Sequence, residues 1–263
     1  MAIRVGIGGW TYEPWRGVFY PPKLPHKREL EYASRQVSAI EINGTFYSRF
    51  KPESYATWAR TAPDGFVFAV KGSRYCISRP KLAEAEDALA GFFAQGLEEL
   101  GDKLGPILWQ FSERRRFDPD DLRGFLQLLP RELKGLPLRH AIHARHESFG
   151  AAEFVALTRE AGVALVYAES DKYPAVADVA GGFAYVRLER AREGLERGYP
   201  EDELDRWADA ARTWAAGGAP ADLPYVAAEP APERPRDVFV FAINGAKVRA
   251  PAVATALIGR LSG

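Results

Sequence analysis

Eight short runs rich in β-branched and aromatic residues recur along the chain, and helix-like stretches separate most of them. The runs lie near residues 3–9, 38–43, 66–71, 105–111, 138–145, 163–169, 183–189 and 237–244. Strands that alternate with helices predict a parallel sheet, because parallel neighbours need crossover connections. Eight such units are the number that closes a barrel. The sequence therefore predicts an α/β fold, a single (β/α)8 TIM barrel with eight parallel strands over residues 1–263.

The stretches between these runs carry helix start and stop signals. Asp118 followed by Pro119 is typical of an N-cap and a first-turn proline. Residues 171–182, between the sixth and seventh runs, are too few for more than a turn or two. The Ala-, Pro- and Gly-rich segment 215–236 reads as a loop that enters the eighth strand from the bottom face, away from barrel active sites. An open doubly wound sheet is the alternative, but Trp10 and Thr11 follow the glycines at 6, 8 and 9, so the dinucleotide fingerprint is missing.

Charge and cysteine content narrow the class of protein. Lys plus Arg and Asp plus Glu both number 35, so no bulk basic field exists to hold nucleic acid, although a local basic site remains open. The single cysteine, Cys76, excludes an intramolecular disulfide and Cys-pair metal sites. No apolar run approaches the roughly 20 residues of a membrane helix, and no signal region opens the chain. We expect a cytoplasmic protein with no membrane partner.

Polar residues collect late in the strands, on one face of each. Because side chains alternate along a strand, parity groups them as Glu41 with Asn43, Lys71, Gln110, His143 with Arg145, Arg187 with Glu189, and Asn244 with Val240 and Ala242. One interpretation is a satisfied ion-pair layer in which Glu41, Glu169 and Glu189 balance Lys71, Arg145 and Arg187. The other is a binding site at the strand ends, where barrel enzymes carry their chemistry. Lys71, Arg74, Arg145 and Arg187 would then clamp an anion.

Several of these residues belong to motifs that resemble one known family. GIGGWTYEPWRGVFYP at 6–21, EINGTFY at 41–47, FAVK at 68–71 and LGPILWQF at 104–111 are similar to successive motifs of the YecE-like family, domain of unknown function 72. AIHARHESF at 141–149 resembles its fifth-strand stretch, and YVRL at 185–188 its seventh strand. The resemblance covers nearly the whole chain. It implies a β/α barrel of uncharacterised biochemical activity and supplies no reaction.

Three positions depart from the family pattern. His143 stands where the family usually has Glu, and Glu189 stands where it usually has His. We hypothesise that the two replacements exchange partners within one carboxylate–imidazole pair, with independent drift as the alternative; a separation well beyond ~6 Å would rule out direct pairing. Ile243-Asn244-Gly245 replaces the family's Asn-Asn-Asp, which weakens any role carried over to that edge.

Metal chemistry is not favoured by the pattern. His140, His143 and His146 repeat every three residues, which on a strand sends alternate members to opposite faces. Glu41, His143, Glu169 and Glu189 could hold a divalent cation from separate strands, but the neighbouring Lys and Arg side chains argue against it. The cofactor is therefore left unknown, and no metal ligand is assigned.

Aromatic residues gather just beyond the first two strand ends. Trp10, Tyr12, Trp15, Phe46 and Tyr47 could be packing, or could form a stacking wall for a sugar ring or a base. The predicted catalytic residues are Glu41, His143 and Glu189, as proton-transfer groups. The predicted substrate-binding residues are Trp10, Tyr12, Asn43, Tyr47, Lys71, Arg74, Gln110, Arg145, Arg187 and Asn244.

Two function classes follow, and both take a small anionic ligand as partner. The first is an enzyme that uses acid/base chemistry on a phosphorylated sugar or nucleotide-like substrate, as a hydrolase, lyase or isomerase. The second is a noncatalytic module that binds an anion or nucleic acid, or docks a partner. The sequence leaves the oligomeric state open.

Overall fold

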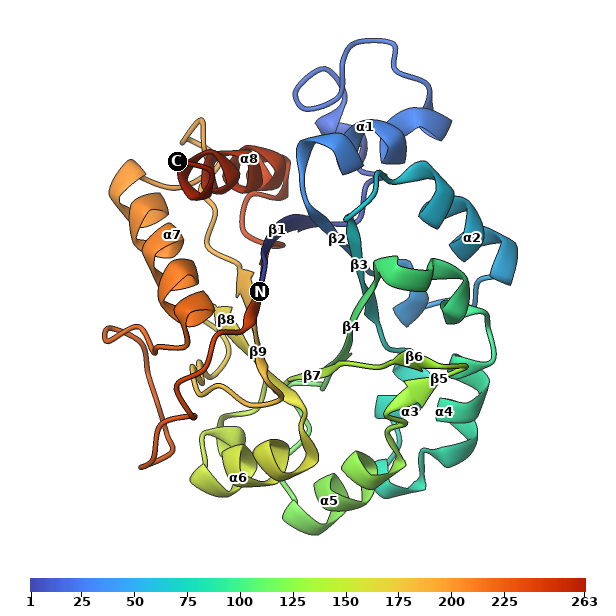
Figure 1. The fold of residues 1–263 in the computed structure, drawn as a ribbon, viewed down its shortest axis with the longest axis vertical. Helices are drawn as coiled ribbons and strands as arrows, with labels where there is room; N and C mark the ends of the chain where they lie inside the picture. Colours follow the sequence, from blue (N-terminus) through green and yellow to red (C-terminus); the bar gives the residue numbers. More distant parts are fainter.

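Eight parallel strands close into a barrel in the computed structural model, which describes all of residues 1–263 (Figure 1). Around the ring the strands follow the order β1 (Ile3–Gly8), β2 (Ala39–Ile42), β3 (Val67–Lys71), β4 (Leu104–Gln110), β7 (His140–His143), β8 (Ala164–Glu169), β9 (Phe183–Leu188) and β10 (Asp237–Ala242). Parallel pairing of β10 with β1 completes the closure. All eight strands fall within the runs predicted from the sequence, give or take a residue at the ends. The predicted (β/α)8 barrel is confirmed.

Helices form the outer ring around the strands (Figure 1). They are α1 (Glu29–Gln36), α2 (Pro52–Thr61), α3 (Arg74–Ile77), α4 (Glu86–Phe93), α5 (Pro119–Leu128), α6 (Ala152–Ala161), α7 (Glu201–Ala216) and α8 (Ala250–Leu261). Asp118 caps α5 as predicted, since its carboxylate accepts hydrogen bonds from the amides of Asp120 and Asp121 at 3.1 Å each. A two-stranded antiparallel hairpin, β5 (Glu132–Leu133) and β6 (Leu136–Pro137), precedes β7. No helix lies between β8 and β9.

The inside of the barrel is packed unequally around its circumference. The strands β2, β3, β7 and β8 contribute the fully buried alanines Ala39, Ala69, Ala141 and Ala164. The strands β9 and β10 contribute the large rings Phe183, Tyr185, Phe239 and Phe241. Gly6 on β1 is also a small inward-facing residue. A Cβ at this position would overlap the Ala39 carbonyl and crowd the Phe241 ring, so the close packing here requires glycine. Large residues on one arc thus fill the space that small residues leave on the other.

The inward face of β10 is not the one predicted from parity. Phe239, Phe241 and Ile243 face the lumen, whereas Val240 and Ala242 pack in the larger core between strands and helices. The interpretation that groups Asn244 with an inward-facing Val240 and Ala242 is therefore wrong. Both faces of this strand are apolar, so alternation alone cannot tell which face is inside.

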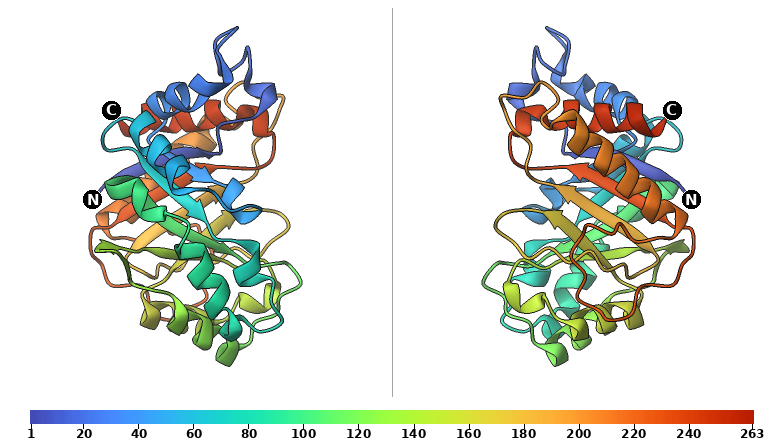
Figure 2. Two further views of the ribbon diagram at one scale, coloured as in Figure 1. Left: turned by 90° about the vertical axis from the view of Figure 1, so that its right-hand side faces the viewer. Right: turned by 90° about the vertical axis from the view of Figure 1, so that its left-hand side faces the viewer.

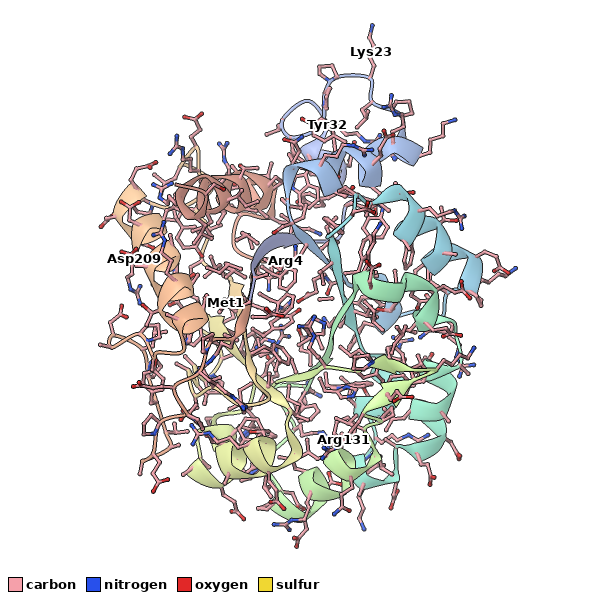
Figure 3. The ribbon with its side chains drawn as sticks, viewed as in Figure 1. Met1, Arg4, Lys23, Tyr32, Arg131 and Asp209 are labelled. Atoms are coloured by element: carbon pink, nitrogen blue, oxygen red, sulfur yellow. The ribbon has the colours of Figure 1, made fainter.

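Two long loops stand out in the fold, one after β1 and one between α7 and β10 (Figure 2). The loop after β1 projects from the body of the molecule, with Lys23 at its outermost point, while Met1 and Arg4 lie near the middle of the ring (Figure 3). Residues 217–236 run from the end of α7 to the amino-terminal end of β10. Asp178 holds this segment, because its carboxylate accepts hydrogen bonds from the amides of Val226 at 2.8 Å and Ala227 at 3.2 Å. None of the helices combines the length and the apolar character that crossing a membrane requires.

Candidate functional site

Arg187 is the centre of a buried polar cluster at the carboxyl end of the barrel. Its Nη2 donates to Glu41 Oε1 at 3.1 Å. Its Nη1 lies 3.0 Å from Gln110 Oε1, 3.1 Å from His143 Nδ1 and 3.0 Å from Glu189 Oε1. These partners come from β2, β4, β7 and the end of β9, and the arginine is only 2% exposed. Alternation along the strands predicts inward faces for all five side chains, and the structure brings all five together.

Glu41 and Arg187 form a charged pair that burial does not neutralise. Burial acts to raise the pKa of Glu41, but the charges of Arg187 and Lys71 and the hydrogen bonds lower it overall. The second carboxylate oxygen accepts the Tyr185 hydroxyl at 2.7 Å. For Arg187, burial acts to lower the pKa, but Glu41 and Glu189 raise it overall. Each oxygen of Glu41 therefore accepts one hydrogen bond, and the carboxylate holds Arg187 and Tyr185 in place.

The contact with Arg187 fixes the tautomer of His143. A guanidinium has only donors, so His143 Nδ1 must accept this hydrogen bond and the ring proton must sit on Nε2. Burial, together with the positive charges of Arg187, Arg145 and Lys71, lowers the pKa of His143 well below its usual range, which keeps the ring neutral. The Nε2 atom is buried and has no hydrogen-bond partner within the protein. His143 therefore presents an unused N–H donor.

Lys71 ends β3, and its ammonium forms no ion pair with a carboxylate. The residue is 7% exposed, and its side chain makes no hydrogen bond. Its Nζ lies 4.6 Å from the centroid of the Phe46 ring. Burial and the charge of Arg187 lower the pKa of Lys71 to about 8, although Glu41 acts in the opposite direction. This lysine is thus easier to deprotonate than one on the surface.

Arg145 is the second cation without a carboxylate. Its guanidinium carbon lies 4.3 Å from the centroid of the Tyr173 ring, and its Nε is buried without a hydrogen-bond partner. Burial, followed by repulsion from Arg187, lowers the pKa of Arg145. The aromatic contact stabilises the cation but leaves its in-plane N–H groups free to bind an acceptor.

The interpretation as a fully satisfied ion-pair layer does not fit these contacts. Glu41 and Glu189 both pair with Arg187, which leaves Lys71 and Arg145 unpaired. Glu169, which could have balanced them, lies in the outer layer and accepts a hydrogen bond from the Tyr199 hydroxyl. Burial raises the pKa of Glu169 to about 7 against the opposing effect of that bond. The cluster therefore carries an excess of positive charge.

His143 and Glu189 do not form the direct pair that the sequence comparison suggests. Both contact the same nitrogen, Arg187 Nη1, at 3.1 and 3.0 Å, and neither a hydrogen bond nor an ion pair joins them. Arg187 Nη1 therefore donates to both residues. With His and Glu exchanged relative to the family pattern, each of the two positions still supplies an acceptor to this nitrogen.

The remaining predicted binding residues surround the cluster or lie apart from it. Asn43 donates from its amide to the Glu41 carbonyl at 3.3 Å. Arg74 is exposed, and its guanidinium donates to the Tyr75 hydroxyl at 3.3 Å. Tyr47 is 60% exposed beyond Phe46, and Asn244 is exposed after β10.

Two of the predicted aromatic residues serve in packing. The Trp10 ring packs edge-on against Trp58 of α2 at 5.3 Å and against Phe68, an outward-facing residue of β3. Tyr12 lies edge-on to Trp15, with Lys247 Nζ 4.5 Å from the centroid of its ring. The structure thus does not bring these two rings to the Arg187 cluster.

Residues that sequence reasoning did not select also shape the cluster. Tyr185 has the same parity as Arg187 and could have been chosen on that basis. Phe46 and Tyr173 provide the ring faces beside Lys71 and Arg145. Tyr173 lies in a stretch without periodicity, so no sequence pattern indicates it.

The three regularly spaced histidines have separate surroundings. His140 Nδ1 accepts from Trp109 Nε1 at 3.2 Å, so its Nε2 donates to the Pro130 carbonyl at 2.7 Å. Burial lowers the pKa of His140 to about 4. His146 caps a short turn through Ser148. No group of three His, Cys, Asp or Glu side chains is placed to hold a metal ion.

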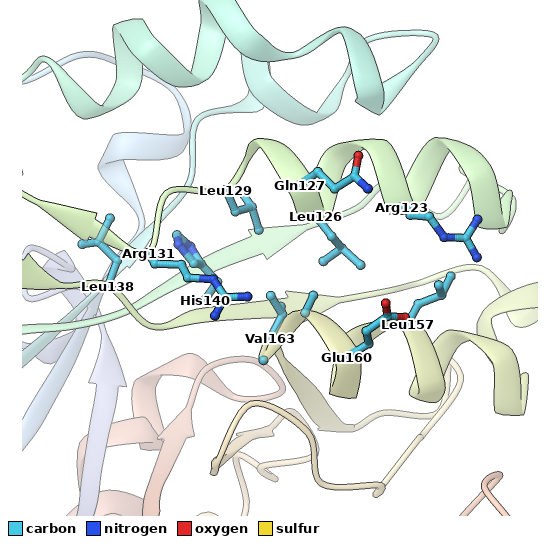
Figure 4. Close-up of a pocket in the computed structure, with 12 residues that line it drawn as sticks. Arg123, Leu126, Gln127, Leu129, Arg131, Leu138, His140, Leu157, Glu160 and Val163 are labelled. Atoms are coloured by element: carbon cyan, nitrogen blue, oxygen red, sulfur yellow. The ribbon is translucent and has the colours of Figure 1, made fainter.

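One cavity lies away from the cluster, between α5 and α6 (Figure 4). It has a volume of about 520 Å³ and is lined by Arg123, Leu126, Arg131, Leu157, Glu160 and Val163 among others. His140 reaches it, but both nitrogens of that ring already have partners. The cavity offers space without convergent chemistry, so we take the Arg187 cluster as the candidate site.

Comparison with known proteins agrees with the fold. A DUF72 family protein from Thermotoga maritima has a TM-score of 0.73 and 20% identity, and the match covers 100% of this chain and 99% of that chain. A DUF72 family protein from Enterococcus faecalis has a TM-score of 0.68 and 17% identity, covering 100% and 98%. The structure of SacUVDE follows with a TM-score of 0.54, 10% identity and 98% coverage of both chains.

No protein with a curated description matches this sequence. A family model described as "Protein of unknown function DUF72" matches residues 4–263. That range includes every strand except the first residue of β1 and every residue of the Arg187 cluster. The chain therefore belongs to the DUF72 family.

Proposed function

We propose that the carboxyl end of the barrel binds a small anionic substrate and acts on it by proton transfer. The observation that carries the proposal is a set of donors without acceptors. His143 Nε2–H and Arg145 Nε are buried without an acceptor, and Lys71 Nζ lies against the Phe46 ring with no hydrogen bond or ion pair to the protein. Buried donors without partners cost free energy, and a ligand that is rich in acceptors would satisfy all three. Phosphorylated sugars and nucleotides have such groups.

The contacts suggest a different role for each residue. Arg145 would hold the anionic group, because its planar fork matches phosphate or carboxylate. His143 would donate from Nε2 to an oxygen that gains negative charge, as a neutral imidazole can. Lys71 would accept or return a proton, because a pKa of about 8 lies close to neutral pH. Glu41 and Gln110 would position Arg187.

Anion binding is tested first, by calorimetric titration with inorganic phosphate and sulfate. We expect saturable binding that weakens about tenfold or more in Lys71→Met and in Arg145→Met, which corresponds to at least about 1.4 kcal/mol per lost contact. Arg74→Met is the matched control, because Arg74 is exposed and bonded to its own neighbour. Absence of saturable binding of both anions, or equal losses in all three variants, would overturn the proposal.

Turnover then separates an enzyme from a binding module. A library of phosphorylated sugars and nucleotides is incubated with the protein, and any compound that is consumed is tested with His143→Gln and Lys71→Met. We expect both variants to lose rate, with Lys71→Met also losing the dependence of rate on pH near 8. If no compound is consumed while phosphate binds, the noncatalytic alternative replaces the enzyme.

A second candidate function is the binding of single-stranded nucleic acid across the same face. Tyr47 and Tyr75 are each 60% exposed, and they follow the neighbouring strands β2 and β3. Exposed rings beside arginine stack on bases and attract phosphates. The test is fluorescence anisotropy with a labelled oligodeoxynucleotide at several salt concentrations. Loss of binding in Tyr47→Ala, Tyr75→Ala and Arg74→Met, with phosphate affinity unchanged, would favour this candidate; binding that is equal in all of them would eliminate it.

A further inference from the structure

We infer that Lys71 is an amine nucleophile that condenses with the carbonyl group of a small anionic aldehyde or ketone to form an imine. This inference rests on the proposed function, because the same cations would hold the anionic group of the compound. It goes beyond that function by naming the substrate class and a covalent step.

The surroundings of Lys71 differ from those of a structural lysine. Lys103, which is also buried, donates from Nζ to the carbonyls of Ala59 and Ala62 at 2.7 Å each. Lys71 has no such acceptor and instead faces the positive charges of Arg187 and Arg145. A desolvated lysine beside other cations favours its neutral form, which is the nucleophilic one. With a pKa of about 8, roughly a tenth of the side chain is neutral at pH 7.

His143 is placed to assist from across one strand. Lys71 pairs in register with Leu108 of β4, and His143 pairs with Gln110, two residues further along the same strand. Both side chains point into the lumen. Because the strands of a barrel tilt, an offset of two residues over two strands keeps Lys71 and His143 in the same layer of inward-facing residues, and the charge of Lys71 acts on the His143 ring. If the carbonyl carbon of a substrate lies against Lys71 Nζ, the carbonyl oxygen would face the free Nε2–H of His143. The carboxylate or phosphate group of the same substrate would then bind Arg145.

The covalent step needs no oxidant or reductant. The lone pair of neutral Nζ attacks the carbonyl carbon, and the π electrons move to the oxygen, which is stabilised by the His143 N–H and takes up a proton. Nζ loses one proton to water, which balances the proton that the oxygen takes up from water, and this gives a carbinolamine. The hydroxyl group then leaves as water with the second Nζ proton, and the C=N bond forms. The overall change is amine plus carbonyl to imine plus one water.

Reductive trapping tests the inference directly on the full chain. The protein is incubated with glyoxylate, reduced with borohydride and digested, and peptides are analysed by mass spectrometry for a carboxymethyl group. We expect Lys71 to be labelled at least tenfold faster than Lys23, which is exposed at the tip of the loop after β1 and serves as an internal reference. The labelling rate should rise with pH around a midpoint near 8. Acetaldehyde, which has no anionic group, should label Lys71 more slowly than glyoxylate does.

Variants keep the two proposals separable. Lys71→Arg keeps the positive charge but has no amine that can condense, so its phosphate affinity should fall less than that of Lys71→Met while labelling at residue 71 is lost completely. Arg145→Met should slow labelling by glyoxylate more than labelling by acetaldehyde, because it removes both the anion contact and one of the charges that favour neutral Lys71. Equal labelling of Lys71 and Lys23 while phosphate still binds would overturn the imine and leave the anion site standing. Failure of both labelling and phosphate binding would overturn the proposed function as well.

Discussion

Glu41 and Arg187 are 146 residues apart in the chain, yet Glu41 Oε1 and Arg187 Nη2 lie 3.1 Å apart inside the barrel. The pair joins β2 to β9, which are not neighbours in the ring. Both side chains are almost completely shielded from water. Removing one member leaves the other as a buried charge without compensation, which costs far more than the pair contributes.

The first prediction concerns the difference between breaking this buried ion pair and replacing all of its members. Arg187→Met should lower the free energy of unfolding by about 3–5 kcal/mol, because it strands two carboxylates. The triple variant Arg187→Met, Glu41→Leu, Glu189→Leu should recover part of the loss. Urea denaturation measures both. Arg192→Met is the control, since its ion pair with Glu203 is at the surface and should contribute less than about 1 kcal/mol. A loss in Arg187→Met no larger than in this control would contradict the buried-charge argument.

The second prediction concerns Glu169. Its pKa in the folded protein is raised to about 7, so the folded state favours the protonated carboxyl. The protonated Glu169 carboxyl therefore stabilises the folded protein. This contribution is complete below the ordinary pKa of 4.5 and is lost as the pH rises through 7. Glu169→Gln cannot ionise, so it should gain stability relative to the wild type as the pH rises, on the order of 3 kcal/mol by pH 8. Denaturation at several pH values tests this, with exposed Glu193→Gln as control. Parallel curves for Glu169→Gln and the wild type would refute it.

The third prediction concerns Gly72, the residue after Lys71. A Cβ at this position would overlap the ring of Trp109, which is fully buried. Gly72→Ala should therefore destabilise the protein by about 1–3 kcal/mol through overpacking and should displace the end of β3. Gly259→Ala is a matched control that should change the stability in the opposite direction. Gly259 lies on an exposed face of α8, and no heavy atom lies within 4 Å of a Cβ added there. There alanine should stabilise by about 0.5–1 kcal/mol. Thermal denaturation of both variants decides the point, and a neutral Gly72→Ala would show that the Trp109 ring can shift freely.

The fourth prediction concerns the segment 217–236. Asp178→Ala removes the acceptor for the amides of Val226 and Ala227, at a cost of about 1–3 kcal/mol for the groups left unpaired. Hydrogen exchange at these two amides should accelerate. Phosphate binding should not change, because the segment lies at the amino-terminal ends of the strands, opposite the Arg187 cluster. A marked loss of phosphate affinity in this variant would show that the two ends of the barrel are coupled.

Strand number and closure were predictable because the alternation of strand and helix repeats eight times, and each repeat is short enough to count. Inward faces were predictable only where polar and apolar residues alternate. On β3 and β9, Lys71 and Arg187 identify the face, since a charged group late in a strand belongs at the mouth of the lumen. On β10, Phe239, Val240 and Phe241 are all apolar, so either face could have packed inside.

The sequence predicts which residues belong to the cluster better than it predicts which of them contact one another. Parity placed His143 and Glu189 in the same lumen, but it could not show that a single Arg187 nitrogen lies between them. The sequence allows Glu169 as a partner of the cations, yet its strand presents Ala164 and Val166 inward, and the glutamate faces the helices. Distances across a barrel depend on stagger and side-chain rotamers, which one-dimensional spacing does not contain.

The division of the lumen into an alanine arc and an aromatic arc restricts how this barrel could change over evolution. Enlarging Ala69 or Ala141 alone would meet a ring that already fills the space, and shrinking Phe241 alone would leave a void. Tolerated replacements on the two arcs are therefore expected to come in compensating pairs, with one side gaining the volume that the other gives up. The strand ends are subject to a different constraint, because His143 and Arg187 are held there by hydrogen bonds rather than by the volume that they fill. New chemistry at the mouth could then arise by single substitutions while the interior below it changes only two residues at a time.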